Sequence, residues 1–138
     1  MAERTKLLII DDDSEFRYAL RGILEGHGYD VVEAGDGTSG LEALQREKPG
    51  LVLLDVIMPV LNGWETLSVI RGRPQWRDLP VVMLTALGGP HGILQSYGLG
   101  CTVHITKPIM DFDELAATID GLLAGAAGSR PEKPPADR

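Results

Sequence analysis

The sequence predicts a doubly wound α/β fold, in which a five-stranded parallel sheet lies between two layers of helices. The first observation is that short apolar runs alternate along the chain with segments of helical periodicity. The second is that these runs are apolar at consecutive positions, which is typical of parallel strands buried on both faces. Right-handed crossovers between such strands predict the order 2-1-3-4-5, with the strands numbered along the chain.

The first half of the chain supplies three of the predicted strands and two helices. The strands are expected at residues 7–10, 29–34 and 51–54. A helix follows the first strand, because apolar residues recur there at helical spacing until Gly26 stops the pattern. The recurring residues are Phe16, Ala19, Leu20, Ile23 and Leu24. Leu41 and Leu44 indicate a shorter amphipathic helix, which Pro49-Gly50 ends.

The second half supplies two strands, at residues 81–84 and 103–106, and three helices. A loop containing Met58-Pro59 and Asn62-Gly63 precedes a helix marked by Trp64, Leu67 and Ile70. The stretch 87–100 contains five glycines and Pro90, so its helix should be short or loose. Asp111 is the expected N-cap of the last helix, with Glu114 completing a capping box before a strong apolar stripe.

One domain is expected over residues 1–124, since 138 residues are enough for one sizeable core. Residues 125–138 are rich in proline, glycine and charge, and they are predicted to be a disordered tail or the stub of a linker.

Composition argues against several classes of protein. The formal net charge of −7 argues against direct nucleic-acid binding. No segment approaches 18 apolar residues and the polar N-terminus has no signal-peptide character, so neither a membrane span nor secretion is expected. Cys101 is the only cysteine, which excludes an internal disulfide and is consistent with a cytoplasmic location.

Three carboxylates, one hydroxyl and one ammonium group follow the carboxyl ends of the predicted strands. Asp11 and Asp12 follow the first strand, Asp55 follows the third, Thr85 the fourth and Lys107 the fifth. Ligands of doubly wound sheets bind outside the carboxyl ends of the strands, so these side chains are expected to form one site.

This set of groups suits a phosphate and a divalent metal. Two carboxylates at about 5 Å repel each other by on the order of 3 kcal/mol at an effective dielectric near 20, and a cation relieves this repulsion. Oxygen ligands favour Mg²⁺, with Mn²⁺ as an alternative, over Zn²⁺. Asp55 stands alone at its strand end and is the best candidate for a nucleophile that forms an aspartyl phosphate. Thr85 and Lys107 can each contact a phosphoryl oxygen.

In this order and spacing the motifs resemble the receiver domain of bacterial two-component response regulators, over about residues 6–123. The matching pieces are Ile10-Asp11-Asp12, Asp55 with Met58-Pro59 and Gly63, Leu84-Thr85-Ala86, and Lys107-Pro108. The resemblance implies a flavodoxin-like fold with the strand order given above. It also implies that the Lys107-Pro108 peptide bond is cis.

The resemblance assigns roles to the site residues. Asp55 would accept a phosphoryl group from the histidine of a sensor kinase or a phosphotransfer protein. Thr85 would move toward the phosphate as a switch, and Lys107 would pair with the phosphate. The implied Mg²⁺ ligands are Asp12, Asp55 and the backbone carbonyl of Ile57, with Asp11 acting mainly through water.

The chain departs from the family at two positions. Members usually carry Tyr or Phe at position 104 as a rotameric switch, and most have Phe where this chain has Ile109. His104 is either a switch or partner-facing residue, or a neutral, partly buried ring. We expect it to stay largely outside and to contact a partner, because the glycine-rich loop at residues 87–92 can rearrange without a rotamer switch. Inward movement would favour the neutral ring, since burial of a charged imidazole is costly.

The leading hypothesis is a phosphorylation-switched signalling module rather than an enzyme, one that assists only its own phosphoryl transfer and hydrolysis. Its output would be a changed surface around the fourth helix, fifth strand and fifth helix, read by a downstream effector protein. The chain is expected to be either a stand-alone receiver or a piece of a larger regulator or hybrid kinase.

Two alternatives belong to other functional classes. A pseudo-receiver would keep the fold as a binding module without using phosphate, and the features in its favour are His104 and the glycine-rich stretch before it. A magnesium-dependent phosphatase would commonly place an acid–base aspartate two residues after its nucleophile, where this chain has Ile57.

Overall fold

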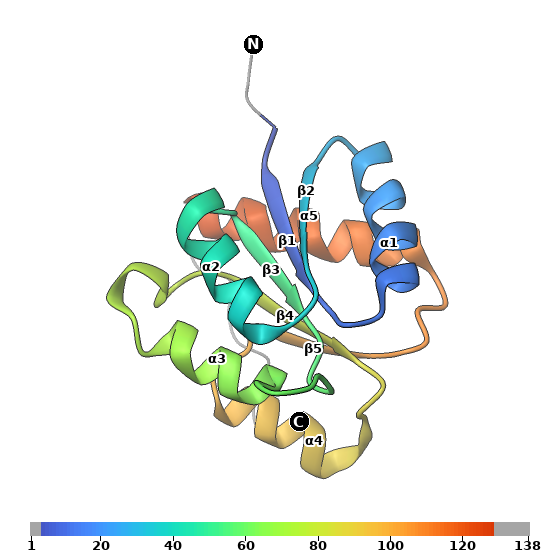
Figure 1. Ribbon diagram of the computed structural model, residues 1–138. Helices are drawn as coiled ribbons and strands as arrows, with labels where there is room; N and C mark the ends of the chain where they lie inside the picture. Colours follow the sequence, from blue (N-terminus) through green and yellow to red (C-terminus); the bar gives the residue numbers. More distant parts are fainter. Residues whose placement is uncertain (1–3, 129–138) are drawn as a thin grey trace.

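The computed structural model describes residues 4–128, with side chains up to residue 125, and confirms the predicted fold class. Five parallel strands form one sheet in the order β2-β1-β3-β4-β5 (Figure 1). The strands are β1 (Lys6–Ile10), β2 (Asp30–Ala34), β3 (Leu51–Leu54), β4 (Val81–Thr85) and β5 (Val103–Thr106). The order predicted from right-handed crossovers is therefore correct.

Helices cover both faces of the sheet. One face packs against α1 (Ser14–Gly26) and α5 (Phe112–Gly128), and the other against α2 (Gly37–Glu47), α3 (Gly63–Arg71) and α4 (Gly89–Gly98). A 3₁₀ turn, η1 (Pro74–Trp76), follows α3. Leu7 and Ile9 of β1 face α1 and α5, whereas Leu8 and Ile10 face the opposite layer. Burial on both faces explains why β1, β3 and β4 are apolar at consecutive positions.

Side-chain caps fix where the helices begin. Asp13 accepts a hydrogen bond from the N–H of Phe16 at the start of α1, and Asp111 accepts from the N–H of Glu114 at the start of α5. Asn62 and Glu65 form a complete capping box at the start of α3, where the sequence indicated only a loop.

Gly63 brings α3 close to the end of β3. A Cβ at this position would lie 2.1 Å from the carbonyl oxygen of Asp55, so only glycine permits this approach. The carboxyl end of β3 and the first turn of α3 are therefore held together.

Two predicted boundaries need adjustment or lie outside the described region. Helix α5 extends to Gly128, so residues 125–128 of the expected tail belong to the helix. The remainder of that tail, 129–138, lies outside the described residues. The glycine-rich stretch 87–100 does form a short helix, the ten-residue α4, with Pro90 in its first turn.

None of the helices within residues 4–128 combines the length and apolar character that a membrane span requires.

Candidate functional site

Three carboxylates meet at the carboxyl edge of the sheet, as the strand order predicts. Asp11 and Asp55 directly follow the adjacent strands β1 and β3, and the N–H of Asp55 donates to the carbonyl of Ile10 at 3.0 Å. Each of Asp11, Asp12 and Asp55 offers a carboxylate oxygen within 4.8 Å of the others. Asp11 and Asp55 are buried, whereas Asp12 is exposed. Three close oxygen donors with one open side fit a hydrated Mg²⁺ ion.

Both carboxylate oxygens of Asp11 already accept hydrogen bonds. Lys107 Nζ donates to Oδ2 at 2.7 Å, and the N–H of Asp13 donates to Oδ1 at 2.9 Å. Burial raises the pKa of Asp11, and the hydrogen bond from Lys107 opposes this rise. An Asp11 carboxylate that is engaged in this way is suited to an indirect, water-mediated role toward a metal.

Lys107 lies between two of the carboxylates. Its Nζ atom is 3.5 Å from Asp55 Oδ2, in addition to the closer contact with Asp11. The ammonium group also lies 4.0 Å from the centroid of the Phe16 ring. Phe16 therefore helps to restrain the lysine, a role that its place in the apolar pattern of α1 did not reveal. The Lys107-Pro108 peptide bond is cis, as the resemblance implied.

Thr85 lies at the end of β4, fully buried, with its hydroxyl turned toward the following loop. Its Oγ atom accepts a hydrogen bond from the N–H of Leu87 at 3.1 Å. Its carbonyl oxygen accepts from the N–H of Lys107 at 2.8 Å. The two residues predicted to contact phosphate are thus joined through the backbone.

His104 is turned inward, so the expectation that it stays largely outside is wrong for this structure. Its Nδ1 atom lies 3.0 Å from the Oγ of Ser96, which also accepts a hydrogen bond from the indole N–H of Trp64. The Nε2 atom is buried and makes no well-formed hydrogen bond among the described residues. Ser96 and Gly92 are the buried positions of α4, and of these two Ser96 is the one that contacts the ring.

Ser96 and Trp64 are functional candidates that the sequence analysis did not identify. Trp64 was noted only as part of an apolar pattern, and Ser96 gave no signal beyond being a polar residue in a glycine-rich helix. Burial of the Ser96 hydroxyl between two ring nitrogens distinguishes it from an ordinary surface serine.

The loops that follow β3 and β5 at the same edge of the sheet carry exposed apolar side chains. Ile57 and Val60, on the loop after β3, are 56% and 95% exposed, and Met110, on the loop after β5, is 88% exposed. Val60 also has a φ angle of 67°, which is unfavourable for a β-branched residue. The N–H of Ile57 donates to Asp55 Oδ1 at 3.3 Å. Exposed apolar side chains beside a charged cluster are typical of a protein contact surface.

The comparison with known families agrees with this geometry, since the model of the response regulator receiver domain matches residues 7–120. The chain belongs to this family. Phosphorylation on an aspartate and the use of Mg²⁺ at an acidic pocket are general to receiver domains, which interact with histidine kinases in two-component systems. Receiver domains have no catalytic enzyme function of their own.

Individual relatives of this receiver domain differ in length. Response regulator Rre1 of Synechocystis sp. is 38% identical over 125 residues, which are 90% of this chain and 54% of that protein. Protein PilH of Pseudomonas aeruginosa is 32% identical over 120 residues, which are 87% of this chain and 98% of PilH. The chain thus spans about half the length of Rre1 and almost the whole of PilH.

Among solved structures, this receiver domain is similar to a CheY-like response regulator receiver domain protein from Methanospirillum hungatei JF-1. The two share 26% sequence identity with a TM-score of 0.84, and the match covers 91% of this chain and 98% of that one.

Proposed function

We propose that Asp55 accepts a phosphoryl group from the phosphohistidine of a sensor kinase or a phosphotransfer protein. The observation that carries this proposal is the meeting of three carboxylates within 4.8 Å, with Lys107 Nζ 2.7 Å from Asp11 and 3.5 Å from Asp55. Carboxylates so crowded repel one another, and a site that holds both a cation and a phosphoryl group relieves that repulsion.

In the proposed transfer, an oxygen of Asp55 attacks phosphorus as the phosphorus–nitrogen bond to the donor histidine breaks, and the histidine leaves with the electron pair. Bound Mg²⁺ would neutralise phosphoryl oxygens, with Asp12, Asp55 and the Ile57 carbonyl as ligands and Asp11 acting through water. Lys107 pairs with one phosphoryl oxygen. Thr85 turns from the N–H of Leu87 and donates its hydroxyl hydrogen to another.

The movement of Thr85 gives the signal a route to the surface. When its Oγ leaves the N–H of Leu87, the loop that leads into α4 loses the hydrogen bond that holds its first residues. We propose that this loop and α4 then shift, and that a downstream effector protein recognises the changed surface around α4, β5 and α5. The acidic balance of the chain argues for a protein target rather than direct nucleic-acid contact.

A second proposal concerns assembly and location. The exposed Ile57, Val60 and Met110 would contact the kinase or phosphotransfer protein around Asp55.

Many relatives carry a further region beyond the matched part, so the effector is either a separate protein or another domain of the same regulator. A cytoplasmic location is consistent with the single, buried cysteine.

The test is phosphorylation in vitro with a small acyl phosphate and Mg²⁺. Intact-mass measurement should show one added phosphoryl group, and removal of Mg²⁺ with a chelator should abolish it. Asp55→Asn is the matched control and should remain unmodified. Comparable labelling of Asp55→Asn would refute the assignment. A folded wild-type protein that takes no phosphoryl group from either an acyl phosphate or a phosphohistidine donor would support the pseudo-receiver.

A further inference from the structure

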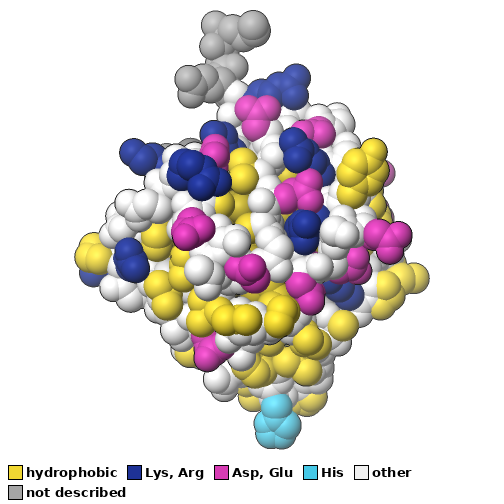
Figure 2. Space-filling model, in the orientation of Figure 1, with side chains coloured by type: hydrophobic (Ala, Val, Ile, Leu, Met, Phe, Trp, Pro, Cys, Tyr) yellow, Lys and Arg dark blue, Asp and Glu magenta, His cyan; other side chains and the backbone are white. Residues whose placement is uncertain are grey.

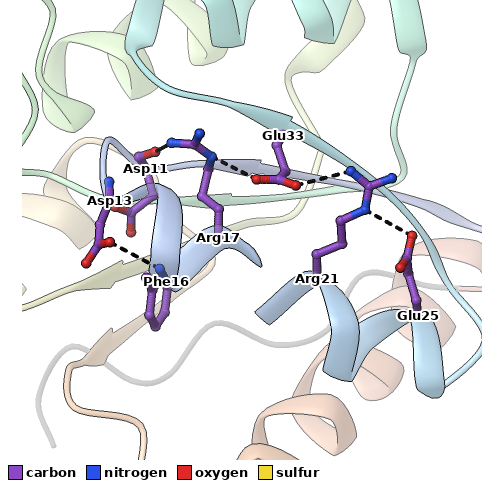
Figure 3. A network of polar contacts seen from close by, with 7 residues as sticks. All are labelled: Asp11, Asp13, Phe16, Arg17, Arg21, Glu25 and Glu33. Carbon is purple, nitrogen blue, oxygen red and sulfur yellow. Dashed lines mark hydrogen bonds and ion pairs between the residues drawn. The ribbon is translucent and has the colours of Figure 1, made fainter. Parts of the chain in front are cut away.

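A guanidinium group holds the loop that carries the acidic cluster. Arg17, in the first turns of α1, donates from Nη1 to the backbone carbonyl oxygen of Asp11 and from Nε to Glu33 Oε1 at 2.9 Å (Figure 3). The side chains of Arg17 and Glu33 are only 17% and 22% exposed. The carbonyl that Arg17 holds belongs to the peptide that joins Asp11 to Asp12.

Arg17 is itself anchored from a second element. Glu33 belongs to β2 and pairs with Ile9 of β1, so the sheet fixes its backbone. Its other oxygen accepts from Arg21 Nη1 at 3.1 Å, and Arg21 Nε donates to Glu25 at 3.0 Å. Figure 2 shows the resulting alternation of basic and acidic side chains over α1 and β2. A continuous series of ion pairs and hydrogen bonds therefore links the surface of α1 to the loop after β1.

Asp12 depends on this anchorage more than Asp11 does. The carboxylate of Asp11 is fixed by Lys107 and by the N–H of Asp13, and its own N–H donates to the carbonyl of Ala34 at 3.1 Å. The exposed Asp12 side chain makes no hydrogen bond or ion pair to another residue in the described part of the chain, residues 4–128. Its direction is therefore set by its backbone, and Arg17 holds the peptide that precedes it.

We propose that Arg17 is a positioning residue for the divalent-cation site. By holding the carbonyl of the Asp11–Asp12 peptide, it aims the Asp12 carboxylate at the space between Asp11 and Asp55. The inference rests on the Mg²⁺ site of the proposed function and adds to it a residue that touches neither the metal nor the phosphoryl group.

Because Arg17 is charged, the direction in which its removal changes the metal affinity distinguishes positioning from simple charge repulsion. A guanidinium close to a cation site repels the cation, so on charge alone the removal of Arg17 would tighten metal binding. If Arg17 positions Asp12, its removal weakens metal binding instead, because partners that orient a metal ligand are commonly worth about 10-fold or more in affinity.

Mn²⁺ titration followed by electron paramagnetic resonance measures the affinity directly, without any phosphorylation readout. Arg17→Gln should weaken Mn²⁺ binding by about 10-fold. Arg21→Gln is the charge-matched control: it removes the same charge one turn further along α1 and leaves the contact of Arg17 with Asp11 in place, so it should weaken Mn²⁺ binding far less than Arg17→Gln does. Arg17→Lys keeps the charge but has one ammonium in place of a forked guanidinium, so it should recover little of the affinity.

A double-mutant cycle with Asp12→Asn separates positioning from a general loss of structure. If Arg17 acts through Asp12, Arg17→Gln should have little further effect in the Asp12→Asn background. If urea unfolding shows that Arg17→Gln is not folded, the Mn²⁺ affinity of Arg17→Lys is used in its place.

Three outcomes would overturn the inference. They are unchanged or tighter Mn²⁺ binding by Arg17→Gln, full affinity in Arg17→Lys, and an undiminished Arg17 effect in Asp12→Asn. Each of these leaves the proposed metal site intact, provided that the wild type binds Mn²⁺. Absence of Mn²⁺ binding by the wild type would refute the metal site itself and this inference with it.

Discussion

The hydroxyl oxygen of Ser96 lies 3.0 Å from Nδ1 of His104, and this contact joins helix α4 to the edge strand β5. The same oxygen accepts the indole hydrogen of Trp64, so one small side chain serves two rings. The N–H of His104 also donates to the hydroxyl of Tyr97 at 3.2 Å. The surface proposed to carry the signal is therefore fastened by polar contacts, in addition to apolar packing.

Replacement of Ser96 by alanine should destabilise the domain by about 1–3 kcal/mol, because two part-buried ring nitrogens would lose the buried hydroxyl that is their partner. The free energy of unfolding in urea, followed by tryptophan fluorescence, measures the effect. Ser68→Ala is the control, since Ser68 is exposed on α3 and should change stability by no more than about 0.5 kcal/mol. Equal stabilities of the two variants would show that the Ser96 contacts contribute nothing.

The half-buried position of His104, whose Nε2 atom is shielded from water, predicts a pH dependence of stability. Burial lowers its pKa below the ordinary value of 6.5, an effect that the backbone carbonyl of Leu87 opposes. As the pH falls below about 6.5 the unfolded chain binds a proton that the folded domain does not, so stability decreases. The decrease should end once the pH is below the folded pKa.

His104→Phe should remove this part of the pH dependence. The measurement is the free energy of unfolding from pH 8 down to pH 5, a window of about three units around the ordinary histidine pKa. His91→Gln, on the exposed surface of α4, should leave the wild-type slope unchanged. A wild-type slope that persists in His104→Phe would mean that another group titrates. The comparison must be between variants, because other groups of the domain also titrate as the pH falls.

The fold was predictable because its three central strands, β1, β3 and β4, are buried on both faces, and that leaves a clear pattern of consecutive apolar residues. The position of Asp11, Asp12, Asp55, Thr85 and Lys107 at one edge followed from the strand order alone. The orientation of His104 did not follow, because it depends on contacts between residues of three elements. The spacing of apolar residues does not indicate that a serine on α4 is buried. Nor does it indicate that Arg17 donates a hydrogen bond to the Asp11 carbonyl.

Asp55→Asn should leave the fold intact and raise the free energy of unfolding, by on the order of 1 kcal/mol. The substitution keeps the shape and removes one of three crowded charges, while Lys107 keeps its closer partner Asp11. Urea unfolding of the unphosphorylated protein tests this. Asp30→Asn removes an exposed carboxylate from the start of β2 and should have no comparable effect. A marked loss of stability in Asp55→Asn would mean that its charge is needed for folding.

Mg²⁺ should bind in the millimolar range, because the site is open and supplies few protein ligands. Binding should be lost in Asp12→Ala. It should only be weakened in Asp11→Ala, because the Asp11 carboxylate of the wild type is already engaged by Lys107 and Asp13. Calorimetric titration measures both affinities. Asp13→Ala is the control: it should cost about 1 kcal/mol of stability as a lost N-cap, with little effect on Mg²⁺ affinity. Equal Mg²⁺ affinity in the wild type and Asp12→Ala would contradict this site.

The aspartyl phosphate should be long-lived. Ile57, two residues after Asp55, and Leu87, two residues after Thr85, are the side chains that we expect to flank the path of an attacking water molecule, and both are apolar. Neither can hold a water or accept its proton, and a positioned general base is worth about 100-fold or more in rate. Ile57→Asn or Leu87→Glu should therefore shorten the phosphate lifetime, by about 10-fold or more if the new group reaches the water.

Ile57→Asn is the cleaner of these two variants, because Ile57 is 56% exposed whereas Leu87 packs partly against the core. The measurement is the decay of the phosphorylated mass after removal of the phosphodonor. Val60→Asn gives the matched control, since Val60 lies on the same loop, is 95% exposed and is further from Asp55 along the chain. Its lifetime should equal that of the wild type. A wild-type half-life of seconds that neither Ile57→Asn nor Leu87→Glu changes would show that water access does not limit hydrolysis at Asp55.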